Sequence, residues 1–383
     1  MNILFLTTVI PSKKRMGSEV ASQCFIDVLN QSGHKVSVVG YLSKDDVFEH
    51  TPQEIVVEKR YIETKRAKFY PLIWLSISLL KRLPYTSTKY LSASYKNIVN
   101  KLLVSTRYDI VIIDHPQLGW LESLIEAKDR LITIAHNIEH EMYLETFNNA
   151  RKFTSKWLYK REAYLIKEME DKLANTVREV WTFTQHDSKY FSNLEGAGRV
   201  RVFALPSGLA KLRDKSINKK FDVGIIGSWA WKANEEGLQW FLQAVYPHLP
   251  ANLSIHVAGK GAEWLTTEYP NIHYQGFVPD AIDFMAQAKV VAIPSLSGGG
   301  IQIKTLDAIA SGTAIVATPV ALRGISEPPQ TVKVAEQPED FASLLVSTIA
   351  SPSVQQAFND ALDWHRTRQD KFIADVACAI NDL

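Results

Sequence analysis

The chain has 383 residues, of which 46% are hydrophobic, and this is enough for two domains of ordinary size. Its 43 lysines and arginines nearly balance its 41 aspartates and glutamates, so the net charge of +2 gives no reason to expect a polyanionic partner. The two cysteines, Cys24 and Cys378, match neither a metal-binding spacing nor a disulfide framework, which suits a reducing cytoplasm.

The N-terminal run MNILFLTTVI is apolar but has no preceding basic segment and no small-residue cleavage site. We therefore expect a buried first strand and not a signal peptide. The longest apolar run, at residues 69–80, is too short for the roughly 20 residues that span a bilayer.

Residues 59–96 are the one local charge asymmetry. They carry nine lysines and arginines against the single Glu63, interleaved with aromatic residues. Two interpretations stay open: a peripheral membrane surface, or a solvated amphipathic helix that packs on its own sheet. Nucleic acid is not expected, because no recognised binding motif accompanies the charge.

Short apolar strands alternate with helical patterns, which predicts parallel sheets made of βαβ units. In the first half we expect strands at residues 2–7, 35–40, 110–114, 131–136 and 177–184. In the second half we expect them at residues 221–227, 253–259, 289–295, 313–319 and 331–335. Several are continuous runs of Ile, Val and Leu, as in strands that are covered on both faces.

Residues 206–220, PSGLAKLRDKSINKK, have no hydrophobic period and predict a linker. The fold class is therefore α/β, with two doubly wound Rossmann-like domains at residues 1–205 and 221–360. Residues 361–383 have a helical pattern, and we expect this helix to cross back to the first domain. A ligand is expected in a cleft between the domains, which the carboxyl ends of the strands face.

Three consecutive glycines follow the strand VVAIP and lead into an amphipathic run. A helix N-terminus offers unpaired N–H groups and a positive dipole end, and glycines let a phosphate approach the backbone. A lysine in the first turn adds a cation, and a carboxylate one turn later can accept hydrogen bonds from sugar hydroxyls. A turn used only for packing is the alternative. The candidate residues of this diphosphate-plus-ribose site are Gly298, Gly299, Gly300, Ile301, Gln302, Lys304 and Asp307.

Other nucleotide-binding motifs are missing from the sequence. It contains no G-x-x-x-x-G-K-[ST], and no G-x-G-x-x-G follows the first strand. It also contains no D-x-D pair, so we expect no aspartate-held divalent metal and no cofactor.

The segment PSLSGGGIQIKTLDAIASGTAIVATPVALRGI resembles the donor-binding signature of GT-B-fold glycosyltransferases of family 4, the group 1 transferases. The resemblance covers most of the chain, through MNILFLTTVIPSKKRMGSE, ITIAHNIEHEMY, FDVGIIGSWAWKANEEGLQWF and YQGFVPDAIDFMAQAKVVAIPS. It implies a retaining hexosyltransferase that uses a nucleotide-diphosphate sugar, with a UDP-hexose, and UDP-glucose in particular, as the candidate donor. With the missing D-x-D pair, we expect this enzyme to be metal-independent. The implied acceptor is a growing, lipid-linked or free, polysaccharide, which suits a protein at the inner face of the membrane.

The chain departs from the family pattern in two places. Members commonly carry Glu-x7-Glu, whereas Gly299 and Asp307 occupy these positions here. The usual Gly-Arg after the first strand of the second domain is Gly227-Ser228. We therefore expect Lys232 and Lys304 to be the cations that face the diphosphate.

The resemblance implies further roles. His136 would contact the donor sugar near its reacting centre, although a histidine that merely caps a strand would look the same. Asn137 and Glu139 would orient His136 or line the acceptor pocket, and Gly17, before a helix, would approach the diphosphate or sugar. Gly276, Phe277 and Val278 would form the segment that binds the base. The alternative is that Phe277 is simply a core residue.

Two other functions stay open from the sequence. One is an isomerase, because UDP-sugar 2-epimerases share this fold. The other is a catalytically silent partner subunit that still binds a nucleotide-sugar, to which Gly299 and Ser228 lend weight.

Overall fold

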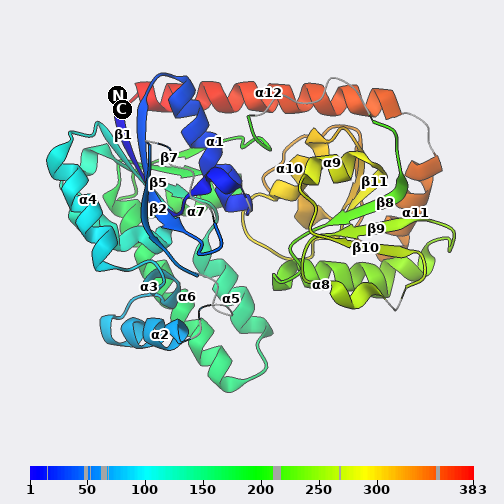
Figure 1. The fold of residues 1–383 in the computed structure, drawn as a ribbon, viewed down its shortest axis with the longest axis horizontal. Helices are drawn as coiled ribbons and strands as arrows, with labels where there is room; N and C mark the ends of the chain where they lie inside the picture. The colour runs from blue at the N-terminus through cyan, green and yellow to red at the C-terminus, as the bar shows by residue number, and fades with distance from the viewer. Residues whose placement is uncertain are drawn as a thin grey trace. The chain divides into compact units, whose positions relative to one another are not determined.

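The computed structural model describes residues 1–14, 16–46, 51, 53–61, 67, 69–209, 217–266, 269–350 and 354–383. The chain divides into two compact units, Met1–Phe203 with Ile373–Leu383, and Ala204–Phe372. Each unit contains one parallel sheet with helices around it (Figure 1). Residues 210–216 of the expected linker lie outside the described residues.

The first unit is built on a seven-stranded sheet in the order β3-β2-β1-β4-β5-β6-β7. Its neighbouring strands pair in parallel, and the order reverses between β1 and β4. The strands are β1 (Asn2–Val9), β2 (Lys35–Leu42), β3 (Glu54–Lys59), β4 (Ile110–Asp114), β5 (Leu131–Ala135), β6 (Glu179–Thr182) and β7 (Arg199–Val202).

Helices cover both faces of this sheet. Phe25 stacks on Trp181 of β6 at 5.3 Å between ring centroids. Tyr95 lies in the same core as Val180, the neighbour of Trp181, and successive strand residues point to opposite faces. The helices are α1 (Gly17–Gln31), α2 (Tyr70–Lys81), α3 (Tyr85–Thr88), α4 (Ala93–Ser105), α5 (Glu139–Asn149), α6 (Phe153–Thr176) and α7 (Gln185–Ser192), with 3-10 segments at Pro11–Lys13, Pro116–Leu124 and Lys128–Arg130.

The second unit has a six-stranded sheet in the order β10-β9-β8-β11-β12-β13, again with parallel pairs and a reversal between β8 and β11. The strands are β8 (Phe221–Ile226), β9 (Ile255–Ala258), β10 (Ile272–Gly276), β11 (Ala288–Ile293), β12 (Ala314–Ala317) and β13 (Val332–Val334). The helices are α8 (Lys232–Trp240), α9 (Ala281–Ala286), α10 (Ile303–Ala310) and α11 (Pro338–Ala350), with a π-helical turn at Phe241–Val245 and 3-10 segments at Tyr246–His248, Glu263–Thr266 and Pro319–Leu322.

Consecutive residues of β11 serve two different cores. Val290 packs in one core with Leu238 of α8, whereas Val291 packs in the other with Leu306 of α10. This is why β11 reads as a continuous apolar run and not as an alternating one.

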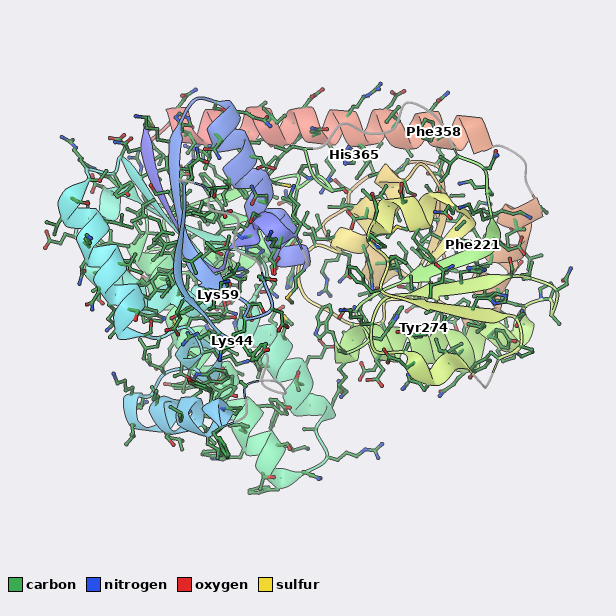
Figure 2. All side chains as sticks on the ribbon, in the orientation of Figure 1. Lys44, Lys59, Phe221, Tyr274, Phe358 and His365 are labelled. Carbon is green, nitrogen blue, oxygen red and sulfur yellow. The ribbon has the colours of Figure 1, made fainter. Side chains whose placement is uncertain are left out.

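Helix α12 (Val354–Asn381) contributes to both units, since the division falls between Phe372 and Ile373. In the second unit Phe358 and His365 of α12 are buried, and Figure 2 labels both on this helix. In the first unit Asp382, just beyond α12, receives hydrogen bonds from Arg199 at 3.1 Å and Arg201 at 2.8 Å.

The fold class expected from the sequence is confirmed, and each of the ten expected strands is present. The prediction missed β3, β7 and β10, which are edge strands of their sheets. Their sequences, EIVVEK, RVRV and IHYQG, carry the polar and charged residues that are typical of sheet edges. Within the described residues, no helix combines the length and apolarity needed to cross a membrane.

Candidate functional site

The three glycines lie in the loop that joins β11 to α10. Gly298 has a φ of +126° and Gly300 a φ of +65°, conformations that side-chain-bearing residues rarely adopt. A Cβ atom on Gly298 would also lie 3.0 Å from the side-chain nitrogen Nε2 of Gln302. Two of the three glycines are therefore required by the path of the loop. Ile301, half-buried, packs against the core, and Gln302 is the N-cap residue of α10.

Lys304 links the first turns of two helices. Its Nζ atom donates a hydrogen bond of 2.9 Å to Oδ1 of Asn234 in α8, and the Asn234 amide donates to the Ser228 carbonyl at 3.1 Å. Burial lowers the pKa of Lys304 to about 8, so the amine still carries its charge at neutral pH. The N-termini of α8 and α10 thus present backbone N–H groups beside one half-buried cation.

This arrangement lies where the strand order reverses, between β8 and β11. Ligands of open α/β sheets bind outside the carboxyl ends of the strands at such a point. Ser228 follows β8 there, and the glycine loop follows β11.

Lys232 is the first residue of α8, and its exposed side chain forms an ion pair with Glu236 at 3.3 Å. Another cation was missed in the sequence: the guanidinium of Arg323 donates to the carbonyl of Gly298. Arg323 belongs to the VALRGI segment, but no spacing rule pointed to it.

Asp307 lies on α10, one turn after Lys304. Its Oδ1 atom accepts a hydrogen bond of 2.6 Å from the Ser207 hydroxyl. Burial raises the pKa of Asp307 to about 7, although the Ser207 hydrogen bond acts in the opposite direction.

Gly276 ends β10 with a φ of +64°, and its carbonyl accepts a hydrogen bond of 2.6 Å from the Gly259 N–H. Phe277 is 66% exposed, with the Lys260 amine 5.1 Å from its ring centroid. The alternative prediction that Phe277 is a core residue is therefore wrong. Val278 is half-buried and packs against the core.

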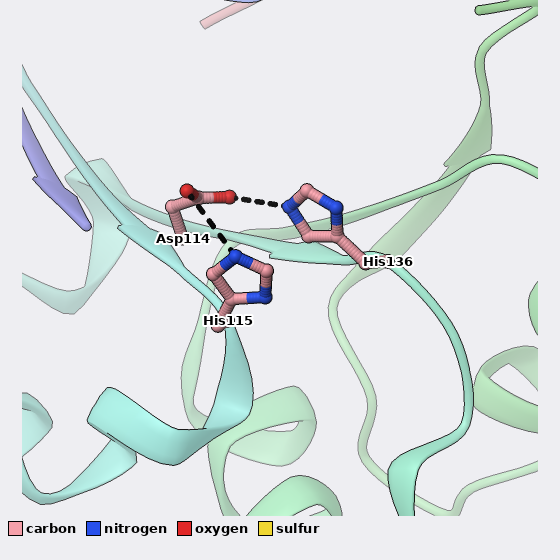
Figure 3. A group of neighbouring side chains, drawn as sticks. All are labelled: Asp114, His115 and His136. Carbon is pink, nitrogen blue, oxygen red and sulfur yellow. Dashed lines mark hydrogen bonds and ion pairs between the residues drawn. The ribbon is translucent and has the colours of Figure 1, made fainter. Parts of the chain in front are cut away.

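In the first unit, His136 belongs to a second constellation, with Asp114 and His115 (Figure 3). Nε2 of His136 lies 2.7 Å from Oδ1 of Asp114, and Nε2 of His115 lies 3.8 Å from Oδ2. The two imidazoles stack with centroids 3.9 Å apart. Asp114 ends β4 and His136 follows β5, so strand pairing brings them together.

Asp114 is fully buried and receives two more hydrogen bonds. The hydroxyls of Thr7 in β1 and Ser22 in α1 each donate to Oδ2 at 2.7 Å. Burial raises the pKa of this carboxyl, but the two histidines and the hydrogen bonds from His136 and Ser22 outweigh it and hold the pKa at about 2. Asp114 is therefore a carboxylate at neutral pH.

His115 has a φ of +82°, which is unusual for a non-glycine residue. Burial lowers its pKa to about 3, and the neighbouring His136 acts in the same direction. A neutral, strained histidine thus lies face to face with His136, and strain of this kind is common at functional sites.

The ligand atoms of Asp114, His115 and His136 lie within 4.8 Å of one another, which raises the question of a metal site. A metal ion lies near the plane of each imidazole that binds it, whereas these rings stack with only 18° between their planes. One ion cannot lie in both planes. The geometry fits a hydrogen-bonded network and does not fit a metal centre.

Asn137 and Glu139 follow His136 but make different contacts. The Asn137 amide lies 2.7 Å from the sulfur of Met142, and its buried Oδ1 has no partner among the described residues. Burial and the nearby Glu170 raise the pKa of Glu139 to about 7. The His136 ring forms its hydrogen bond instead with the Asp114 carboxylate, which accepts it.

Gly17 is the first residue of α1 and not the residue before it, since Met16 is the N-cap. The same helix carries Ser22. The sequence prediction missed Asp114, His115, Thr7 and Ser22. One signal in the sequence could have indicated this group: Asp114 is an aspartate at the end of the buried strand IVIID.

Residues 220–351 match the family model described as "Glycosyl transferases group 1". The chain contains a group 1 glycosyltransferase domain. Among curated proteins, an uncharacterized 44.6 kDa protein in the cps region of Klebsiella pneumoniae is 22% identical over 348 residues, 84% of each chain.

Solved glycosyltransferase structures share the fold along nearly the whole chain. Sucrose-phosphate synthase of Thermosynechococcus elongatus matches with a TM-score of 0.67 at 14% identity, over 100% of this chain and 98% of its own. WaaG, a glycosyltransferase of lipopolysaccharide biosynthesis, matches with a TM-score of 0.63 at 14% identity, over 99% of each chain. Anabaena HepE in complex with UDP-glucose matches with a TM-score of 0.62 at 16% identity, over 100% of each chain. The expected glycosyltransferase with the GT-B fold is confirmed.

Proposed function

We propose that this glycosyltransferase moves a hexose from a nucleoside-diphosphate sugar to a glycan or lipid-linked glycan in polysaccharide biosynthesis. A UDP-hexose is the first choice of donor, and UDP-glucose in particular, because structural neighbours were solved with UDP-glucose or UDP. The relative from a cps region and the lipopolysaccharide enzyme WaaG support a polysaccharide acceptor. The observation that carries the proposal is the Lys304–Asn234 contact, which places a cation between two helix N-termini.

The diphosphate would lie at these N-termini, where glycines allow close approach of its oxygens. Lys304 supplies a fixed charge. Lys232 supplies a movable one, because its exposed ion pair with Glu236 is weak. These groups stabilise the charge that develops on the departing diphosphate without a divalent metal.

The nucleoside would be recognised by the segments next to this position. Asp307 accepts hydrogen bonds from the ribose hydroxyls, and Gly276 to Val278 bind the base through main-chain groups. The exposed ring of Phe277 offers an apolar face to the base.

On the first unit, His136 contacts the sugar as positive charge develops at its reacting carbon, and the reaction retains the anomeric configuration. Asn137 and Glu139 line the acceptor pocket, and Gly17 brings the backbone of α1 close to the substrate.

The test is a transfer assay with the purified full chain, a panel of UDP-hexoses and glycan acceptors of increasing length, with and without a lipid. We expect release of UDP together with an acceptor that is heavier by one hexose. Conversion of one UDP-sugar into another without an acceptor would assign the chain to the isomerases. Binding of UDP-sugars without turnover across the panel would indicate the silent partner subunit.

We also propose that the protein attaches reversibly to membranes through α2. The outer side of this helix, which we call the α2 face, carries five apolar residues that are more than 45% exposed: Phe69 78%, Leu72 67%, Ile73 50%, Leu79 49% and Leu80 86%. The exposed Ser76 lies among them, and its hydroxyl donates to the Leu72 carbonyl at 2.9 Å. Its opposite side is buried through Trp74 and Ser78. A soluble helix normally presents polar residues to water, so a face with this many exposed apolar residues marks an interaction surface.

The surroundings of the α2 face favour an anionic lipid surface. Lys81 and Arg82 end the helix, both exposed, whereas Lys65 and Arg66 lie outside the described residues. Helix α6 joins α2 through Arg161, whose guanidinium donates to Ser78 at 2.7 and 2.8 Å. The same helix exposes Phe153 and Trp157, aromatic residues that suit the membrane interface.

A further inference from the structure

Asp114 is surrounded by three hydrogen-bond donors: the Thr7 hydroxyl, the Ser22 hydroxyl and the His136 ring. We propose that Asp114 is a positioning residue that fixes His136 in the tautomer with its hydrogen on Nε2, so that Nδ1 is presented to the substrate as a hydrogen-bond acceptor. This inference rests on the proposed role of His136 at the reacting sugar.

The direction of the hydrogen bond follows from the carboxylate. An ionised aspartate only accepts hydrogen bonds, so the ring nitrogen at 2.7 Å must carry the hydrogen. The low pKa of Asp114 keeps this true at neutral pH. In the neutral form of the ring, which has one N–H, Nδ1 then carries the lone pair.

The two hydroxyls hold the carboxylate in place. The Thr7 hydroxyl also lies 3.3 Å from the Val9 carbonyl, and the Ser22 hydroxyl lies 2.9 Å from the Ser18 carbonyl. Each hydroxyl has one proton, and the charged carboxylate at 2.7 Å is the closer and stronger acceptor in both cases. Oδ2 is thereby occupied, and Oδ1 is left for His136.

Two rings fix the plane of the imidazole. His115 stacks on one face at 3.9 Å, and Phe183 contacts it edge-on at 5.1 Å with an interplanar angle of 84°. The hydrogen bond to Asp114 then sets the rotation within that plane. His136 is only 10% exposed, so few other orientations are open to it.

Asp114→Asn separates the charge and acceptor role of the side chain from its shape. The amide oxygen can still accept from Thr7 and Ser22, but the amide NH₂ then faces Nε2 and favours the tautomer with hydrogen on Nδ1. A carboxylate-to-amide exchange behind a catalytic histidine lowers turnover by about 10⁴-fold in serine proteases, through the wrong tautomer.

The experiment measures the ¹⁵N chemical shifts of the histidine ring nitrogens in the labelled full chain, with His136→Gln used to assign the His136 signals. We expect hydrogen on Nε2 in the wild type and on Nδ1 in Asp114→Asn. We also expect kcat to fall at least about 10²-fold, with UDP affinity within about twofold of the wild type. Thr133→Val is the matched control, because it removes a buried hydroxyl that donates to the Ile113 carbonyl at 3.0 Å on the same pair of strands. It should leave both the His136 shifts and kcat unchanged.

A wild-type spectrum in which Nδ1 of His136 carries the hydrogen overturns the proposed tautomer. This test needs only the wild-type chain, so it applies even if Asp114→Asn does not fold. An unchanged His136 tautomer in folded Asp114→Asn also overturns it, as does a changed tautomer with unchanged kcat. A wild-type chain that transfers no sugar would count against the proposed function instead, because the spectra judge the role of Asp114 without turnover.

Discussion

Ser207 donates a hydrogen bond of 2.6 Å to Oδ1 of Asp307, and so ties the carboxyl group on α10 to the segment that follows β7. Burial raises the pKa of Asp307 to about 7 in spite of this bond. The carboxyl group is therefore divided between its protonated and ionised forms at neutral pH. Ribose hydroxyls that donate to it would favour the ionised form.

Asp307→Ala should weaken UDP binding by about 1.5–3 kcal/mol, the range for hydrogen bonds to charged groups. Isothermal calorimetry on the folded variant measures this change, and Ser207→Ala shows how much depends on the orientation of the carboxyl group. Unchanged UDP affinity in Asp307→Ala would mean that the carboxyl group does not bind the ribose.

The raised pKa of Asp307 also predicts a pH dependence. Because the folded pKa of about 7 exceeds the ordinary 3.8, the stability that this group contributes is complete below pH 3.8 and is lost as the pH rises through 7. UDP affinity should change in the opposite direction and increase as Asp307 ionises. Asp307→Asn should remove both trends, and a wild-type curve that coincides with that of the variant would contradict the assignment.

The sequence predicted the sheets and the glycine loop because these features are local. Gly298 and Gly300 directly precede a helical pattern in the sequence. The strands β4 and β5 are continuous apolar runs. Asp114 was missed because nothing near it in sequence marks it as a partner of His136. Its donors Thr7 and Ser22 come from β1 and α1, and only the parallel pairing of β1, β4 and β5 brings these residues together.

Lys304 and Lys232 should act mainly on the diphosphate. Lys304→Ala and Lys232→Ala should weaken UDP binding by on the order of 10- to 100-fold and leave uridine binding nearly unchanged, since uridine has no phosphates. Titrations of both ligands test this, with Lys333→Ala on the edge strand β13 as the matched control. Equal losses for UDP and uridine would mean that the lysines contact another part of the ligand.

Transfer should not require a divalent metal. The helix N-termini and lysines supply the positive charge at the diphosphate, and the stacked His115 and His136 rings do not fit an ion between them. Rates in excess chelator should equal those in magnesium or manganese. A collapse in chelator that only added metal restores would show that an ion takes part.

Membrane attachment should depend on the α2 face. Leu72→Ser with Leu80→Ser should reduce co-sedimentation with anionic vesicles at least about 10-fold, because each exposed leucine would contribute about 1.5–3 kcal/mol on insertion. Val104→Ser is the control, since Val104 is 90% exposed but lies on α4. Wild-type protein that ignores such vesicles at low salt would exclude a lipid partner. A dimer that these leucine substitutions dissociate would assign the α2 face to a second copy of the chain.

His136 offers the sharpest test of the proposed transfer mechanism. A histidine that merely caps a strand should, when removed, lower stability and leave the turnover of the folded fraction intact. A histidine that acts only as positive charge develops on the sugar should lower kcat and kcat/KM together, with UDP binding preserved. We therefore expect His136→Ala to fold, to bind UDP almost normally, and to lose at least about 10²-fold in kcat.

His136→Asn refines this prediction, because its side-chain amide takes the place of Nδ1 and can still bond to the sugar, although it is too short to replace the Nε2 contact with Asp114. It should recover part of the lost rate if hydrogen bonding is the role of His136. The loss has a second possible origin, since removal of the ring leaves the buried carboxylate of Asp114 without one of its three donors. Thermal unfolding of both variants separates that cost in stability from the loss in rate. Near wild-type transfer by folded His136→Ala would end the catalytic assignment, while the diphosphate site at the glycine loop would still stand.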